Sequence, residues 1–181
     1  ERLLQQLGGA NGSLETLGLR IATGYTASKI LWFKTHHPAL WAQLHTVLLP
    51  HDYLNFWLTG ERVAEYGDAS GTGLFDVRTR RWSKTAVDLI DDSGRLWQAL
   101  PPLKSAECCI GTVRPAAAEK LGLGPAVRVS TGGGDNMMAA IGSGNIEAGP
   151  LTLSLGTSGT LFAWSAAPVT AESDMIAGFC S

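Results

Sequence analysis

The sequence predicts an α/β fold, and three observations along its 181 residues support this. Segments with helical apolar spacing alternate with short strand-like segments through most of the chain. Residues 126–129 form an apolar strand candidate that leads through Gly132, Gly133 and Gly134 into an apolar helix beginning at Asp135. Residues 151–155 and 160–164 flank a turn of small residues, which predicts a β-hairpin.

The composition indicates a globular protein with no sign of a nucleic-acid or membrane partner. Hydrophobic residues make up 45% of the chain and charged residues 17%, which allows a substantial core and argues against disorder. The net charge of −2 gives no reason to expect nucleic acid or an anionic membrane as a partner. No apolar run reaches the roughly 18 residues that a membrane-spanning helix needs.

The cysteines and histidines suggest neither a disulfide framework nor a metal site. Cys108, Cys109 and Cys180 lack both a disulfide pattern and a zinc-binding spacing, which predicts a reducing compartment, the cytoplasm. The four histidines lie between residues 36 and 51 without a metal-ligand spacing that includes an acid. We expect surface or packing roles for these histidines and no metal bound by them.

The first third of the chain is predicted to be mainly helical. Helices are expected over residues 26–37, 38–44 and 50–58, the last one ended by Gly60, with a buried strand at 46–49. Tyr25, Trp32 and Phe33 lie at helical spacing, so we assign them to the core.

The middle of the chain alternates between strands and helices. Strands are expected at residues 62–66, 74–77 and 110–113, a turn at 79–82, and helices at 84–91, 96–100 and 115–121. Ser83 is a candidate N-cap, and Gly122 ends the helix that precedes it. Residues 142–150 look like a crossing between two domains.

Asp135 is the leading candidate for chemistry. An acid that follows a strand and a tight glycine turn lies where α/β proteins usually bind small ligands. Its carboxylate could accept a proton from a substrate hydroxyl, as the acid of a phosphoryl-transfer enzyme does. The alternative is a helix N-cap that only satisfies backbone N–H groups.

A second motif lies about 20 residues further on, in the turn that contains Gly156, Thr157 and Ser158. Successive backbone N–H groups and hydroxyls in such a turn can hold a phosphate. An ordinary hairpin turn explains the same residues. The Walker P-loop pattern is absent from the sequence, which excludes a P-loop protein. The dinucleotide-binding glycine pattern is incomplete, which disfavours a Rossmann-type oxidoreductase.

Four segments together resemble the FGGY family of carbohydrate kinases, and most of all its members that act on xylulose. They are residues 24–36 with their Lys-x-x-Trp core, residues 51–61 with the Asp-Ala-Ser-Gly-Thr sequence at 68–72, residues 132–136, and residues 156–159. The Gly-Asp-Asn form at 134–136 is typical of the xylulose kinases. The resemblance extends over nearly the whole chain and is weak before residue 20.

This resemblance implies part of an actin-like ATPase (ribonuclease H-like) fold, with a mixed sheet flanked by helices. Residues 1–145 would be the C-terminal part of the first, sugar-binding domain, and residues 146–181 would open the second, ATP-binding domain. Asp135 would be the general base and would contact the sugar together with Asn136. Gly156, Thr157 and Ser158 would bind the phosphates of ATP, and Mg²⁺ would screen those phosphates. Asp68 and Thr72 could line the sugar side, but we do not assign them to the site.

The implied activity is ATP-dependent phosphorylation of a ketopentose, D-xylulose to D-xylulose 5-phosphate. Two alternatives stay open: a kinase for ribulose, gluconate or glycerol, and a non-catalytic sugar-binding relative. The family's Asp-x-Gly-Thr phosphate motif and its adenosine-binding segment are missing from these 181 residues, so we expect the chain to be a fragment that is inactive alone. A homodimer is compatible with the sequence, which does not define the oligomeric state.

Overall fold

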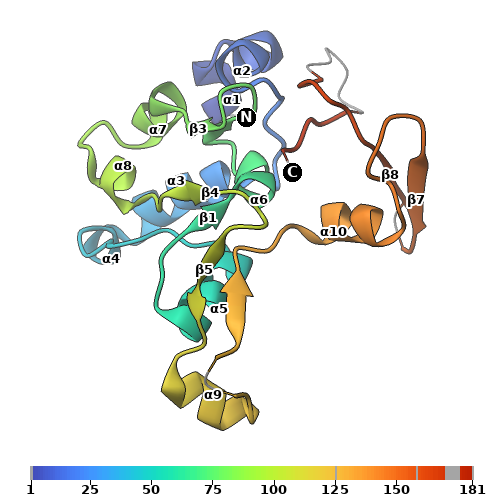
Figure 1. Cartoon of the computed structure of the whole chain (residues 1–181). Coiled ribbons are helices and arrows are strands. Elements are labelled where there is room, and N and C mark those ends of the chain that lie inside the picture. Colours follow the sequence, from blue (N-terminus) through green and yellow to red (C-terminus); the bar gives the residue numbers. More distant parts are fainter. Residues whose placement is uncertain (1, 125, 158, 170–175, 181) are drawn as a thin grey trace.

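The computed structural model describes residues 2–124, 126–157, 159–169 and 176–180, and Figure 1 labels their helices and strands. The helices are α1 (Arg2–Gln6), α2 (Gly9–Leu17), α3 (Thr26–His36), α4 (Pro38–Trp41), α5 (Pro50–Thr59), α6 (Tyr66–Ser70), α7 (Lys84–Ile90), α8 (Arg95–Ala99), α9 (Pro115–Leu121) and α10 (Asp135–Gly142). The strands are β1 (Ala64–Glu65), β2 (Phe75–Asp76), β3 (Arg81–Trp82), β4 (Leu103–Lys104), β5 (Cys109–Thr112), β6 (Arg128–Ser130), β7 (Leu151–Leu155) and β8 (Gly159–Ala163). No helix in these ranges is long and apolar enough to cross a membrane.

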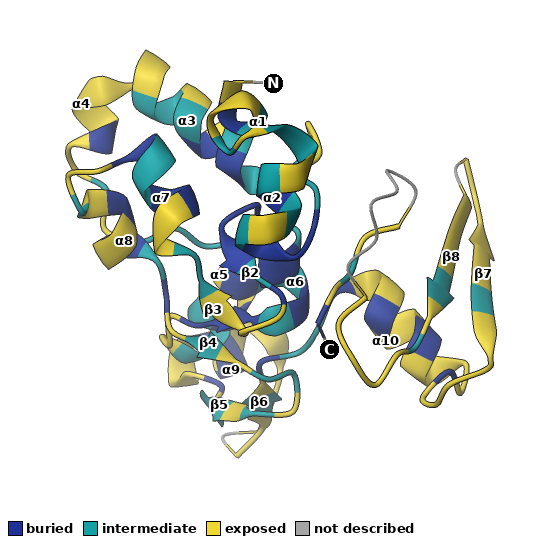
Figure 2. Ribbon diagram, turned by 90° about the horizontal axis from the view of Figure 1, so that it is seen from above, coloured by how far each residue is buried: buried dark blue, intermediate teal, exposed yellow. Residues whose placement is uncertain are grey.

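Most of the buried side chains lie in a body formed by α1 to α8 (Figure 2). Phe75 on β2 is fully buried at its centre and packs edge-on against the ring of Trp82 on β3. Leu17, Val87 and Leu96 complete this core from α2, α7 and α8. The apolar faces of short helices are therefore buried against one another, as expected when burial rather than helix propensity supplies most of the stability.

A smaller apolar cluster lies under α9, at the tip of the molecule in Figure 1. Val113, Ala117 and Ala118 are buried there against Trp57 and Leu58 of α5, with Val129 of β6. The antiparallel pair β5–β6 connects this tip to the body and has a register shift between Cys109 and Gly111.

The strands pair two by two in the described residues. β1 and β4 are parallel, and β2–β3, β5–β6 and β7–β8 are antiparallel. The α/β class is confirmed, but its parallel and antiparallel pairs lie in four separate two-stranded sheets rather than in one mixed sheet.

The hairpin β7–β8 and helix α10 form a lobe beside the body (Figures 1 and 2). Asn145 is buried at the end of α10 and joins helix and hairpin. Its Nδ2 donates to Thr152 Oγ1 over 3.1 Å and to the Phe162 carbonyl over 3.3 Å. The inner face of the hairpin is thereby fixed against α10.

Several helix boundaries confirm the sequence signals. Proline stands at the first turn of α4, α5 and α9, and Gly60 and Gly122 end α5 and α9 in the left-handed conformation. Ser83 caps α7 by accepting a hydrogen bond from Ala86 N over 3.3 Å.

Three local expectations are wrong. Residues 46–49 form no strand, because Val47 N–H bonds to the Ala99 carbonyl at the end of a helix and finds no partner strand. Tyr66, expected to end a strand at residues 62–66, instead begins α6, because the Glu65 carboxylate caps this helix by accepting from the backbone N–H groups of Gly67 and Asp68. Trp32 is 54% exposed and stacks on His36 instead of entering the core.

Candidate active site

The glycine turn (residues 131–134) connects β6 to α10 and determines where Asp135 lies. Thr131 N and Gly132 N donate to the carbonyls of Cys108 and Ala106, which holds the start of the turn against the segment before β5. Gly132 has φ +78°, a left-handed conformation that glycine adopts without strain. Gly134 has extended backbone and is the N-cap residue of α10.

Asp135 and Asn136 are exposed at the first turn of α10. Asp135 is the first helical residue rather than the N-cap, and its Oδ1 accepts a hydrogen bond from Asn136 N over 2.8 Å. The N-terminal helix end favours a carboxylate in this place. The side chain therefore keeps a backbone contact and also faces solvent, where a substrate hydroxyl could reach it.

The second predicted motif lies at the end of the hairpin. The β7–β8 ladder ends at the pair Leu155–Gly159, and Gly156 and Thr157 lie beyond it, both exposed. Ser158, the third predicted phosphate contact, lies outside the described residues. Thr160 Oγ1 is 3.5 Å from Asn136 Oδ1, so the strand that follows the turn lies beside the residue that follows Asp135.

A charged pair that the sequence analysis missed lies directly behind the glycine turn. His51 Nδ1 on α5 is 2.7 Å from Asp68 Oδ2 on α6, and His51 Nε2 is 2.7 Å from the Thr131 carbonyl oxygen. Asn55, one turn later on α5, donates from Nδ2 to the same carbonyl over 2.6 Å. The i, i+4 spacing of His51 and Asn55 was the available signal, but their partners lie 17 and 76 residues away along the chain.

Neighbouring carboxyl groups determine the pKa of His51. The hydrogen bond to Asp68 raises the pKa of His51 to about 9, against the opposing effect of burial. Burial raises the pKa of Asp52 to about 6, although Asp52 Oδ2 accepts from Leu49 N over 3.2 Å. Burial likewise raises the pKa of the Glu65 carboxyl above its usual range. His51 thus carries positive charge at neutral pH among three carboxyl groups.

Of the weaker candidates, the structure brings Asp68 to the site and keeps Thr72 out of it. A Cβ atom added at Gly134 would lie 2.9 Å from Asp68 Oδ1, so this carboxylate touches the end of the glycine turn. Thr72 is buried, and its hydroxyl donates to the Ala69 carbonyl and accepts from Leu74 N, which is a structural role.

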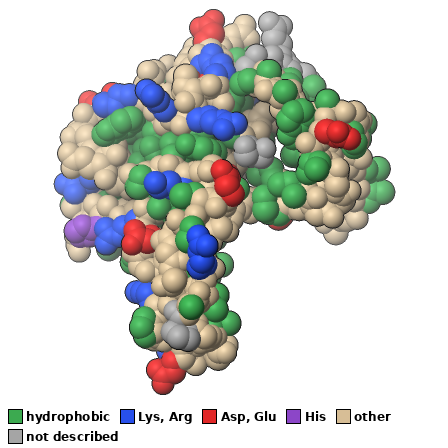
Figure 3. All heavy atoms as spheres, viewed as in Figure 1, with side chains coloured by type: hydrophobic (Ala, Val, Ile, Leu, Met, Phe, Trp, Pro, Cys, Tyr) green, Lys and Arg blue, Asp and Glu red, His purple; other side chains and the backbone are tan. Residues whose placement is uncertain are grey.

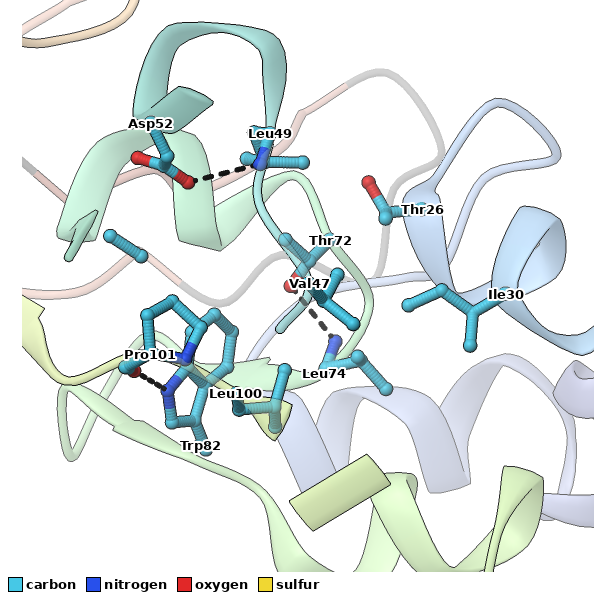
Figure 4. A pocket seen from close by; sticks show the side chains of 11 residues that line it. Thr26, Ile30, Val47, Leu49, Asp52, Thr72, Leu74, Trp82, Leu100 and Pro101 are labelled. Atoms are coloured by element: carbon cyan, nitrogen blue, oxygen red, sulfur yellow. Dashed lines mark hydrogen bonds between the residues drawn. The ribbon is translucent and has the colours of Figure 1, made fainter. Parts of the chain in front are cut away.

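The small pocket in Figure 4 is not a sugar site. It has a volume of about 10 Å³, and Asp52 lies at its edge with its bond to Leu49 drawn as a dashed line. Trp82 and Pro101 bound it on another side. Such a volume holds one water molecule at most. A second hollow, of about 140 Å³, lies between α10 and β8 and is mainly apolar.

The described residues contain no group of three or more His, Cys, Asp or Glu side chains that could hold a metal ion. Mg²⁺ in phosphoryl-transfer sites is bound largely by substrate phosphates with one or two carboxylates. The exposed Asp135 carboxylate fits that donor set, and a protein cage of ligands is not required.

Comparison with known proteins places the chain among carbohydrate kinases. The model of the FGGY family of carbohydrate kinases, N-terminal domain, matches residues 1–142. The xylulose kinase of Haemophilus influenzae is 49% identical over 99% of this chain, which corresponds to 36% of that protein. The crystal structure of xylulose kinase from Rhodospirillum rubrum superposes with a TM-score of 0.84 at 25% identity, covering 94% of this chain and 35% of the other. A kinase structure from Brucella ovis, described as a xyloylose kinase, gives a TM-score of 0.77 at 34% identity over 90% of this chain and 33% of its own. The chain thus spans about a third of the length of the relatives it matches, and it adopts part of the actin-like ATPase fold.

Proposed function

Because the chain belongs to the FGGY family of carbohydrate kinases, we propose that the protein containing it transfers the γ-phosphoryl group of ATP to a ketopentose. The sugar we assign is D-xylulose and the product D-xylulose 5-phosphate. Support comes from the names of its relatives and from the Asp135–Asn136 pair at the exposed start of α10. The observation that carries the proposal is this exposed pair, which directly follows a glycine turn held by backbone hydrogen bonds to Ala106 and Cys108.

In this proposal Asp135 is the general base. Its Oδ1 is engaged by Asn136 N, so Oδ2 is the atom we assign to the proton of the attacking sugar hydroxyl. Asn136 would hydrogen-bond a neighbouring hydroxyl. Phosphoryl transfer depends mainly on positioning and on charge stabilisation, so a base held at a fixed place contributes even with an ordinary pKa.

ATP would be bound from the hairpin side. The exposed backbone of Gly156 and Thr157 fits a phosphate, because it extends past the last ladder pair and is reachable from solvent. Ser158 completes the proposed contact. Bound Mg²⁺ would neutralise charge on the transferred phosphoryl group.

The proposal includes the domain assignment. Residues 1–145 would belong to the sugar-binding domain and residues 146–181 would begin the ATP-binding domain. The end of the family match at residue 142 and the irregular backbone that follows α10 support this division. We also propose a cytoplasmic location, supported by the free thiols of Cys108, Cys109 and Cys180.

The test is a coupled ADP-release assay on the full-length protein with xylulose, ribulose, gluconate and glycerol. We expect turnover with xylulose to exceed that with the other three. Asp135→Asn should lower kcat by at least about 100-fold, because the variant keeps the shape of the side chain and loses the base. Asp92→Asn, at an exposed acid between α7 and α8, is the matched control and should keep full activity.

Turnover that survives Asp135→Asn would refute the assigned base. A wild-type protein that binds xylulose and releases no ADP would instead establish the non-catalytic alternative. Size-exclusion chromatography of the same sample decides between a monomer and a homodimer.

A further inference from the structure

His51 makes two short contacts that a neutral imidazole cannot make together. Its Nδ1 faces a carboxylate oxygen of Asp68 and its Nε2 faces the carbonyl oxygen of Thr131, each at 2.7 Å. A carbonyl and a carboxylate only accept hydrogen bonds, whereas a neutral ring has a single N–H. Both contacts are hydrogen bonds only when the ring carries two protons and a positive charge.

The His51–Asp68 pair packs against the glycine turn at two places, with the imidazole at Gly132 and the carboxylate at Gly134. A Cβ atom at Gly132 would lie 2.9 Å from His51 Nε2, and one at Gly134 would lie 2.9 Å from Asp68 Oδ1. His51 lies on α5, Asp68 on α6, and the turn follows β6. The pair therefore joins three separate elements at the place from which Asp135 projects.

The charged groups that face His51 all favour the protonated ring. Asp52 Oδ1 on α5 is 4.0 Å from Nδ1, Asp68 comes from α6, and the Glu65 carboxyl at the start of α6 interacts electrostatically with His51. The Thr131 carbonyl adds its dipole from the glycine turn. These contacts agree with the pKa of about 9 for His51.

We infer that His51 is a positioning residue of the proposed kinase: paired with Asp68, it fixes the glycine turn and thereby the place of the Asp135 carboxylate. The inference rests on the proposed function. It assigns His51 no contact with sugar or ATP. Small displacements of a reacting group can cost about 100-fold in rate, so a residue that acts through the turn can have a large effect.

The experiment compares His51→Gln, His51→Lys and Asp68→Asn in the full-length protein, with the exposed His45→Gln as matched control. We expect His51→Gln to lower kcat by about 10- to 100-fold while the KM for ATP changes little. His51→Lys keeps the cation and should recover a large part of kcat. The double variant His51→Gln with Asp68→Asn should be no slower than the worse single variant, because both changes break the same link.

Two readouts separate positioning from a merely structural role. In the wild type, kcat should fall as the pH rises through about 9, and this fall should move to higher pH in His51→Lys. Nitrogen NMR of labelled histidine should show both His51 ring nitrogens protonated at pH 7.5. This spectrum is recorded on the wild type, so it depends neither on catalysis nor on whether a variant folds.

Wild-type activity with an unchanged kcat in folded His51→Gln would overturn the inference and leave the proposed function intact. A single protonated ring nitrogen at pH 7.5 would also overturn it. A wild type without sugar-dependent ADP release would refute the proposed function itself, and the positioning role with it.

Discussion

Asp52 shows how one buried carboxyl can make stability depend on pH. It is 1% exposed at the start of α5, and burial raises its pKa to about 6 from an ordinary value near 3.8. The folded state therefore holds a proton that the unfolded state has already released between these pH values. The free energy of unfolding that this group contributes falls as the pH rises from about 4 to about 6 and is constant above that range.

We predict that Asp52→Asn removes this dependence. Asparagine can still accept the hydrogen bond from Leu49 N through its carbonyl oxygen and carries no charge to desolvate. Relative to the wild type, the variant should gain on the order of 2 to 3 kcal/mol between pH 4 and pH 7. Urea denaturation of the full-length protein at several pH values measures this. A constant difference between the two proteins across that range would contradict it.

The His51–Asp68 pair acts in the same direction as Asp52, but at higher pH. The folded pKa of His51 is raised above that of an ordinary histidine, so its contribution to stability is complete below about pH 6.5 and is lost as the pH rises through about 9. The wild type should consequently lose stability from pH 7 to pH 9.5 relative to His51→Gln in the same denaturation experiment. Parallel curves for the two proteins over that range would argue against a charged His51.

At the scale of single elements, α7 depends on its cap. Ser83 Oγ accepts from Ala86 N and satisfies one of the backbone donors that a helix start leaves unpaired. We predict that Ser83→Ala costs about 1 kcal/mol and that Ser83→Asn restores most of it, because asparagine caps equally well. The midpoint of urea denaturation reports both. Equal midpoints for alanine and asparagine would show that the cap does not contribute.

Elements with local signals could be predicted from the sequence, and those that depend on distant partners could not. Proline and glycine mark the ends of α5 and α9 because they act on the backbone of the helix itself. Residues 46–49 are apolar and strand-like, but a strand requires a partner, and the sequence does not reveal that none pairs there.

The same distinction applies to the candidate site. Asp135 follows three glycines, and this motif alone makes it the candidate base. His51 contacts Asp68 and Thr131, at separations of 17 and 80 residues along the chain, and its charge follows from those contacts. Without the fold it resembles the other histidines of its stretch, so only a surface or packing role could be expected for it.

At the scale of the whole molecule, the outer face of the β7–β8 hairpin determines whether the 181-residue chain associates with itself. Leu151, Leu153, Leu155 and Leu161 are each 60% exposed or more, and Figure 3 shows hydrophobic side chains gathered on the lobe of α10 and the hairpin. The cross-strand pair Leu153–Leu161 lies in the middle of that face. Exposed apolar patches of this kind favour association.

We predict that the 181-residue chain, expressed alone, self-associates at micromolar concentration through this face. Leu153→Thr with Leu161→Lys should shift it toward the monomer, since the pair would then present polar groups. Light scattering after size exclusion measures the mass. Leu40→Thr with Leu121→Lys is the control, because both leucines are exposed but lie outside the hairpin. This variant should leave the mass unchanged. A monomeric unmodified chain would disprove the prediction.

The small core under α9 implies that opening motions are unevenly distributed along the chain. Its three buried side chains hold far less apolar surface than the main core, so this tip should open at lower free energy. Thr131 ends that region, because its N–H and hydroxyl both donate to the Cys108 carbonyl. These bonds should keep the opening of the tip from reaching Thr131 and the glycine turn. Amide hydrogen exchange should therefore become sharply slower from Val127 to Thr131.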